Sequence, residues 1–228
     1  MTAIQPLGEA AWTVVLGNRV DRALHARVTA LAARIAQARL PGVVEIVPAY
    51  AAVTVFFDSG GTAGEEIRRA LVELGGQAGA RAGGLKERSG GQEIGRTSGV
   101  DRPTVLIPVR YDGPDLEEVS ARTSLTREEV IRRHTAPEYL VYLLGFAPGF
   151  GYLGDLDPAL ILPRRSAPRT RVPAGSVAIA GAQTAVYPLE TPGGWHLIGR
   201  TTLSLFDPRR DPPALLAPGD RVRFEALE

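Results

Sequence analysis

The sequence predicts an α+β protein in two parts: a small two-layer domain with the order β-β-α-β-β-α, then a barrel or sandwich of short strands. Two amphipathic helical patterns beside short apolar runs predict the first part. Short apolar runs separated by Pro and Gly predict the second. A stretch rich in Gly, Ser, Gln and Arg between them is typical of a linker. We therefore expect domains at residues 1–82 and 104–228, joined by a linker at residues 83–103.

Composition excludes several classes of function. With 44% apolar and 22% charged residues and a net charge of +1, the chain is typical of a folded protein and gives no global reason to expect nucleic acid or a membrane as partner. The absence of cysteine excludes disulfides and a thiolate nucleophile. Three widely spaced histidines make a histidine-rich metal site unexpected. No signal peptide or membrane span is evident, so we expect a cytoplasmic protein.

The first helix is expected over residues 18–40, where apolar residues recur at steps of three and four. Asn18 is the expected N-cap, and Pro41-Gly42 should end the helix. The apolar stripe consists of Val20, Leu24, Val28, Leu31 and Ile35.

The other elements follow from similar signals. A second helix should begin near Thr62, which can form a capping box with Glu65. Two short helices are expected in the second half. Asp115 with Glu118 is the expected N-terminal cap of the first, and Thr126 with Glu129 that of the second. Strands or apolar strand-like runs are expected over residues 11–16, 43–47, 52–57, 104–109, 139–144, 176–180, 184–187, 195–198, 201–206 and 221–224.

A loop rich in glycine and aromatic residues, residues 145–152, is the first candidate site. Glycine permits backbone turns closed to other residues, and aromatic rings beside such a loop can wall a pocket. The candidate binding residues here are Phe146, Pro148, Gly149, Phe150 and Tyr152. The alternative is a tight loop whose rings anchor it to the barrel core.

An arginine-rich segment, residues 163–173, is the second candidate. It contains Arg164, Arg165, Arg169 and Arg171 between prolines. The planar guanidinium group suits a carboxylate or phosphate, because it donates two parallel hydrogen bonds. The alternative is a solvated loop.

Further polar residues could converge at the mouth of the barrel, namely Gln183, Thr184, Tyr187 and Arg200. His134, at the end of an expected helix, is a candidate general base; the alternative is that it stabilises the helix C-terminus. The chain has no Walker A pattern, so a standard P-loop does not bind ATP here.

A long string of motifs carries a family resemblance that covers nearly the whole chain. It runs from His134-Thr135 through Gly145-Phe-x-Pro-Gly-Phe-x-Tyr-Leu and Val172-Pro-Ala-Gly-Ser to Pro192-Gly-Gly-Trp and Gly199-Arg-Thr. The chain resembles the family that contains the B-type subunit of 5-oxoprolinase, the Kip-type kinase inhibitor and the first allophanate hydrolase subunit (carboxyltransferase subdomains C and D).

The resemblance implies a cyclophilin-like closed β-barrel as the second domain. It also implies an ATP-dependent hydrolase of 5-oxoproline that is active only with a homologous barrel subunit and a LamB/YcsF-type subunit. ATP, with or without Mg²⁺, would be a co-substrate of the complex. In that setting we expect His134, Arg165 and Arg200 to be catalytic, and the aromatic loop, Arg164, Arg169, Gln183, Thr184 and Tyr187 to bind substrate or nucleotide at one concave rim.

Two other functions fit the same resemblance. A histidine-kinase inhibitor would act by docking its barrel on the kinase, and a carboxyltransferase component would serve a urea or allophanate system.

Overall fold

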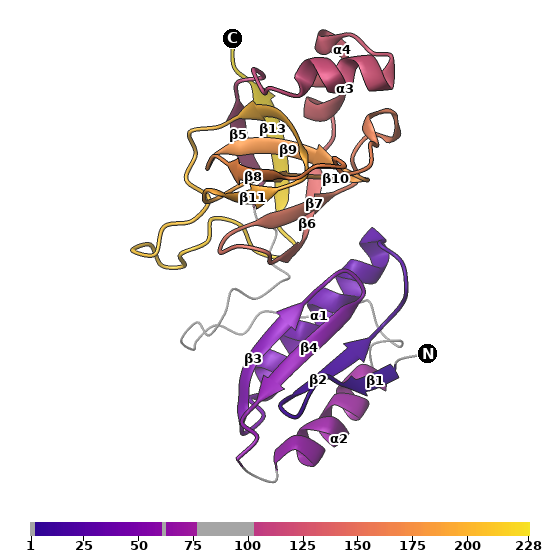
Figure 1. Cartoon of the computed structure of the whole chain (residues 1–228). Helices are drawn as coiled ribbons and strands as arrows, with labels where there is room; N and C mark the ends of the chain where they lie inside the picture. Colours follow the sequence, from indigo (N-terminus) through magenta and orange to yellow (C-terminus); the bar gives the residue numbers. More distant parts are fainter. Residues whose placement is uncertain (1–2, 61–62, 77–102) are drawn as a thin grey trace. The chain divides into compact units, whose positions relative to one another are not determined.

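The computed structural model describes residues 3–60, 63–76 and 103–228. The chain divides into two compact units, Met1–Asp101 and Arg102–Glu228, each described below by itself (Figure 1). All but the last residue of the expected linker, and the expected capping residue Thr62, lie outside the described residues. Within those residues, no helix is both long and apolar enough to cross a membrane.

The N-terminal unit is a four-stranded antiparallel sheet with both helices on one face. Its elements are β1 (Ala3–Pro6), β2 (Ala11–Val15), α1 (Arg22–Ala38), β3 (Val43–Pro48), β4 (Ala52–Phe57) and α2 (Ala63–Gly76). The strands lie in the order β1-β2-β4-β3. Alternate residues of β4, Val53, Val55 and Phe57, form one core with buried residues of both helices. The expected two-layer β-β-α-β-β-α order is confirmed.

The start of α1 differs from the expectation. Asp21, not Asn18, is the N-cap, because its Oδ1 accepts the N–H of Leu24 at 2.8 Å. The predicted stripe residue Val20 therefore precedes the helix and is 56% exposed. Asparagine and aspartate cap helices equally well, so the pattern alone could not choose between two such residues three positions apart.

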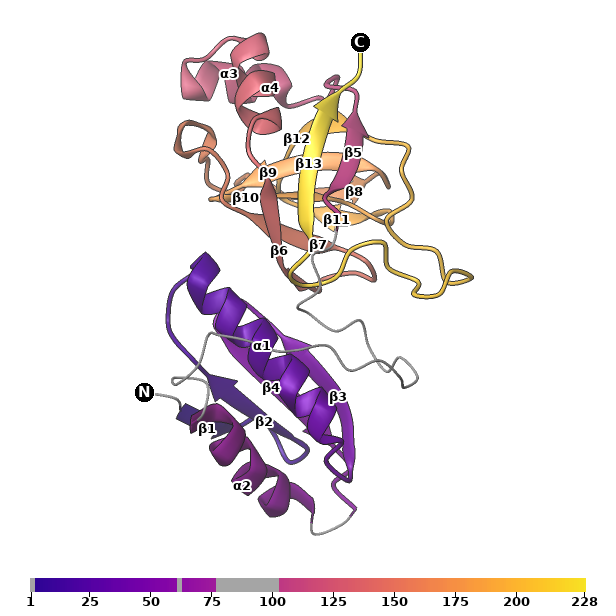
Figure 2. The same cartoon turned by 180° about the vertical axis from the view of Figure 1, so that it is seen from behind.

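The C-terminal unit is a barrel with two helices at one end (Figures 1 and 2). Its seven-stranded sheet has the order β12-β9-β10-β7-β6-β13-β5, with β5 and β13 parallel. A separate pair joins β11 to β8. The elements are β5 (Val105–Val109), α3 (Leu116–Thr123), α4 (Arg127–Thr135), β6 (Tyr139–Leu144), β7 (Gly151–Gly154), the 3-10 turn η2 (Pro158–Leu160), β8 (Arg169–Val172), β9 (Ser176–Ala180), β10 (Gln183–Val186), β11 (Thr191–Gly193), β12 (His196–Arg200) and β13 (Arg221–Ala226).

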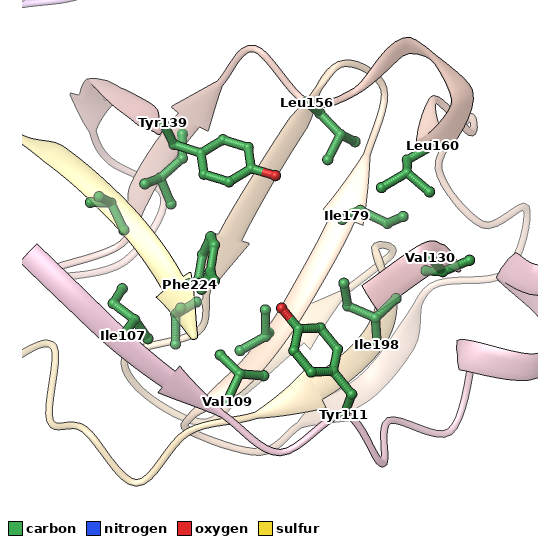
Figure 3. Packing of buried hydrophobic residues seen from close by; sticks show 14 of the residues in the cluster. Ile107, Val109, Tyr111, Val130, Tyr139, Leu156, Leu160, Ile179, Ile198 and Phe224 are labelled. Atoms are coloured by element: carbon green, nitrogen blue, oxygen red, sulfur yellow. The ribbon is translucent and has the colours of Figure 1, made fainter. Parts of the chain in front are cut away.

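Backbone hydrogen bonds close the sheet. Arg110, which follows β5, donates its N–H to the carbonyl of Arg200 at 2.9 Å and accepts the N–H of Arg200 at 2.8 Å. The first and last strands of the sheet order are thereby joined, so the expected closed barrel is confirmed. The interior is filled by side chains that include the rings of Tyr111, Tyr139 and Phe224 (Figure 3).

Some strand boundaries expected in this unit are wrong. Residues 201–206 form no strand, and Phe206 makes only an isolated bridge to Ala214. Strands β7, β8 and β11 lie in segments expected to be loops. Glycine and proline in those segments favour a loop assignment. Strands of three or four residues beside turns are also too short to show the alternation of apolar and polar residues that identifies a strand.

Candidate functional site

The outer face of β7, β9, β10 and β12 is covered by a second hydrophobic cluster. Every residue of β9 is buried: Val177 and Ile179 point into the barrel core, whereas Ala178 and Ala180 belong to the outer cluster. A strand buried on both faces requires other side chains to pack against its outer face and cover it. The cover comes from aromatic side chains and from Val172 of β8.

Five rings form this cover, which we call the aromatic cluster. Phe150 lies at its centre, with ring centroids 4.9 Å from Tyr152, 5.3 Å from Tyr187 and 5.8 Å from Trp195, all edge-on. Phe146 lies 5.2 Å from Phe150. Phe150, Tyr187 and Trp195 are buried, Tyr152 is partly exposed and Phe146 is 62% exposed. The cluster therefore has a rigid base and an apolar edge in solvent.

A tight turn presents Phe146. Both Phe146 (φ 71°) and Gly149 (φ 77°) have left-handed backbone conformations. At Gly149 a side chain would also meet Phe206, because a Cβ would lie 2.8 Å from the Cβ of that residue. The N–H of Phe150 donates to the carbonyl of Ala147 at 3.0 Å and fixes the turn. The predicted loop of glycines and aromatic anchors is present, and its rings pack outside the barrel.

Two of the predicted arginines are already paired. Arg165 donates from Nη1 to Asp115 Oδ1 at 3.0 Å and to Glu118 Oε2 at 2.7 Å. Arg169 donates from Nη2 to the same Asp115 oxygen at 2.6 Å. The Arg165 guanidinium lowers the pKa of Glu118. Both arginines are therefore held by carboxylates of the protein, although Nε of Arg165 and Nη1 of Arg169 are buried without a hydrogen-bond partner among the described residues.

Arg164 differs from Arg165 and Arg169 in its surroundings. Its guanidinium carbon lies 5.9 Å from the centroid of the Trp195 ring, close enough for a cation–π contact. Across the described part of the chain, no carboxylate lies within ion-pair distance of it. Arg164 is exposed, and it also lies close enough to Tyr187 to affect that side chain electrostatically. Burial is the main cause that raises the pKa of Tyr187. An unpaired cation at the edge of an aromatic cluster can bind a small carboxylate or phosphate.

His134 and Thr184 lie on the other side of the barrel wall. Thr184 donates its hydroxyl proton to the carbonyl of Ala178 at 3.1 Å, so it must accept from Nε2–H of His134 at 2.8 Å. Nδ1 of His134 then accepts from the hydroxyl of Tyr111 at 2.6 Å. His134 is 0% exposed, and burial lowers its pKa to about 3. Its ring is therefore a neutral, fully bonded core group, contrary to the expectation of a general base in contact with substrate.

The remaining predicted residues are dispersed. Arg200 pairs with Asp112 at 2.7 Å and lies five residues along the chain from Trp195, which corresponds to about 16 Å of strand. Gln183 begins β10 and is partly exposed. Pro148 is exposed in the turn beside Phe146. The structure thus brings together the aromatic loop, Tyr187 and Arg164, but not Arg200 or His134.

Sequence reasoning misses Asp115 and Trp195 as site residues. The sequence marks Asp115 only as a helix cap, and its partners lie 50 and 54 residues further along the chain. No local signal pairs them. Trp195 carries a usable signal, because a tryptophan beside a Pro-Gly-Gly turn and a basic segment could form part of a pocket wall. No group of three His, Asp or Glu side chains that could hold a metal occurs among the described residues.

The C-terminal barrel bears an aromatic cluster on its outer face, with Arg164 at the edge of the cluster, and a two-layer α+β unit precedes the barrel in the chain. The family model described as "Carboxyltransferase domain, subdomain C and D" matches residues 2–216. The chain belongs to this family.

Individual proteins are also similar to this chain. The chain is 44% identical to the B-type subunit of 5-oxoprolinase from Bacillus subtilis, over 97% of this chain and 91% of the relative. It is also 44% identical to the B-type subunit of 5-oxoprolinase from Escherichia coli O157:H7, over 96% of this chain and 93% of the relative. The solved structure of TTHA0988 is 40% identical with a TM-score of 0.79; the match covers 96% of this chain but only 40% of that longer one.

Proposed function

We propose that this chain is the B-type subunit of an ATP-dependent 5-oxoprolinase, which opens the lactam ring of 5-oxoproline to give glutamate. The observation that carries the proposal is 44% identity, over more than nine-tenths of both chains, to two proteins named as this subunit. The name implies other subunits, and we propose a homologous barrel subunit and a LamB/YcsF-type subunit as partners in the cytoplasm.

The aromatic cluster suits such a substrate. A five-membered lactam has flat faces that can pack on the rings of the cluster that reach solvent, Phe146 and Tyr152, and its carboxylate can pair with Arg164. The guanidinium group of Arg164 would orient the substrate, because it would hold the carboxylate at one end of the molecule. The lactam bond is a resonance-stabilised amide. Transfer of the γ-phosphoryl group of ATP to its carbonyl oxygen releases ADP and activates the carbonyl carbon; addition of water to that carbon and cleavage of the C–N bond then give glutamate and phosphate. We propose that ATP, with or without Mg²⁺, is a co-substrate of the complex; the absence of a Walker A pattern means that a standard P-loop of this chain does not bind it.

Reconstitution tests the proposal. The chain should be purified alone, with the second barrel subunit, and with both partners, and glutamate formation from 5-oxoproline should be measured with and without ATP. We expect glutamate only with all three subunits and ATP. No turnover in the complete mixture overturns the proposal. If the chain alone then inhibits histidine-kinase autophosphorylation, the inhibitor alternative replaces it.

A further inference from the structure

Asp115 joins the arginine-rich segment to the strand that follows Trp195. Its side chain is 4% exposed. Oδ1 accepts from Arg165 and Arg169, at 3.0 and 2.6 Å, and Oδ2 accepts the N–H of Leu197 at 2.7 Å. Its own N–H donates to the carbonyl of Leu197 at 3.0 Å. One buried carboxylate therefore fixes two arginines and the start of β12.

Asp115 makes these bonds instead of capping a helix. It occupies the N-cap position of α3, where an aspartate normally accepts an N–H from the first turn, yet its side chain makes no capping hydrogen bond. Both carboxylate oxygens are directed away from the helix. Their partners come from segments 50 or more residues distant, so the side chain ties together parts of the barrel that bear the candidate site.

We call residues 163–168, which lead into β8, the arginine loop. Two further bonds lay it against the Trp195 segment. The N–H of Arg165 donates to the carbonyl of Gly194 at 2.8 Å, and Nε2–H of His196 donates to the carbonyl of Pro163 at 2.9 Å. Trp195, between the two partners on that segment, is 4% exposed. The loop therefore contributes to the burial of the indole.

The arginines of this segment differ in whether their charge is paired with a carboxylate. Arg165 and Arg169 share the negative charge of Asp115, and Arg165 also pairs with Glu118. Arg164, the neighbour of Arg165, lies over Trp195 instead. Arg164 is therefore the arginine of residues 163–169 that has no carboxylate partner in the described part of the chain, and it lies at the edge of the aromatic cluster. A single cation selects a singly charged small anion over a polyanion, since a phosphate chain would favour several unpaired arginines.

We infer that Asp115 is a positioning residue for the site. It pairs with Arg165 and Arg169 and anchors the arginine loop, so that Arg164, which has no carboxylate partner within the described residues, is presented over Trp195 to a small monocarboxylate. The identity of that carboxylate as 5-oxoproline rests on the proposed function. The anchoring of the loop does not.

The anchoring can be tested on the chain alone. The two tryptophans are Trp12 and Trp195, so a Trp12→Phe background leaves one indole as reporter. In that background Asp115→Asn should raise the Stern–Volmer constant for acrylamide quenching at least about twofold, because the freed loop exposes the indole. Arg171→Gln is the matched control; its pairing with Glu190 does not involve Asp115, and quenching should not change. Unchanged quenching in Asp115→Asn overturns the inference.

The positioning role is tested in the three-subunit complex. Asp115→Asn should raise KM for 5-oxoproline about tenfold with kcat changed less than about threefold, because the binding cation is misplaced while the chemistry is not. Asp115→Glu keeps the charge and should recover part of the loss. A fall in kcat at unchanged KM overturns the role. If the wild-type complex is inactive while the quenching result holds, the proposed function fails and the anchoring stands.

A second variant protects the test against misfolding. If circular dichroism shows that Asp115→Asn does not fold, Arg169→Gln takes its place, because it removes one of the two guanidinium partners and leaves Asp115 paired with Arg165. Quenching should then rise in the same direction, by a smaller factor. No rise overturns the inference.

Discussion

Nε2 of His134 lies 2.8 Å from the hydroxyl of Thr184, inside the barrel and on the opposite side of its wall from the aromatic cluster. The two residues are 50 positions apart and complete a chain of hydrogen bonds from Tyr111 to the carbonyl of Ala178. These hydrogen bonds give both ring nitrogens of His134 a partner, so the side chain is not an isolated polar group in an apolar core. This arrangement makes His134 a determinant of stability.

Acid should destabilise the C-terminal unit through His134. Burial lowers the pKa of this side chain from 6.5 to about 3. Because the folded-state pKa lies below the unfolded-state value, the unfolded chain takes up the proton first, and stability falls as the pH drops from about 6.5 towards 3. Between about pH 7 and pH 5 the loss should be about 2 kcal/mol. Urea denaturation at several pH values measures it.

The control is His134→Gln, which cannot titrate. This variant should be less stable at about pH 7 by about 1–3 kcal/mol, because it leaves buried partners incompletely bonded. Its stability should vary less with pH than that of the wild type. An equal pH dependence in both proteins would assign the effect to other groups.

Arg164→Gln should impair substrate binding without unfolding the barrel. Arg164 makes no ion pair within the described residues, so the loss of stability should stay below about 1 kcal/mol. In the three-subunit complex, KM for 5-oxoproline should rise about tenfold or more, because the proposed carboxylate partner is lost. Arg171→Gln, an exposed arginine paired with Glu190, should leave KM unchanged. Equal effects of the two variants would contradict the site assignment.

Phe150 and Phe146 form a matched pair within the aromatic cluster. Phe150 is 1% exposed and contacts three other rings of the cluster besides Phe146, whereas Phe146 is 62% exposed. Phe150→Ala should cost about 3–5 kcal/mol of unfolding free energy, and Phe146→Ala less than about 1 kcal/mol. Chemical denaturation of both variants checks the difference. Similar losses would show that Phe146 is a structural anchor as well.

Much of the fold follows from sequence patterns because the patterns are local. The alternation in residues 52–57 and the capping residue Thr126 report local conformation, and both elements are present. Barrel closure depends on the bridge between Arg110 and Arg200, which are 90 residues apart and lack any pairing signal. Such contacts are set by the geometry of the whole sheet.

The candidate site is only partly predictable for the same reason. Side chains close together in sequence, such as Phe146 and Phe150, are grouped correctly. His134 follows Arg132-Arg133 in a polar stretch, so the sequence gives no sign that its side chain is buried in the core. The pairing of Arg165 and Arg169 with Asp115 has no sequence signal. The pattern therefore offers four arginines in residues 163–173, of which the structure, over the residues it describes, leaves Arg164 without a carboxylate partner.

Gly113 offers a test of barrel closure. A Cβ at this position would lie 2.4 Å from the carbonyl carbon of Ile198 and from the oxygen of Leu197. Both are backbone atoms of β12 and cannot swing aside, so Gly113→Ala must displace the strand. We expect a loss of about 3 kcal/mol in the unfolding free energy of the C-terminal unit. Asp115 bonds to Leu197 through its amide and its carboxylate, so the displacement should also loosen the arginine loop and increase acrylamide quenching of Trp195.

The matched control is Gly76→Ala at the end of α2, where a Cβ would meet nothing within 4 Å. It should change stability by no more than about 1 kcal/mol, in the stabilising direction that alanine gives in a helix. A Gly113→Ala protein as stable as the wild type would mean that β12 can move away from residue 113 at little cost. The Arg110–Arg200 bridge would then be too weak to fix the barrel wall on which Trp195 and the arginine loop depend.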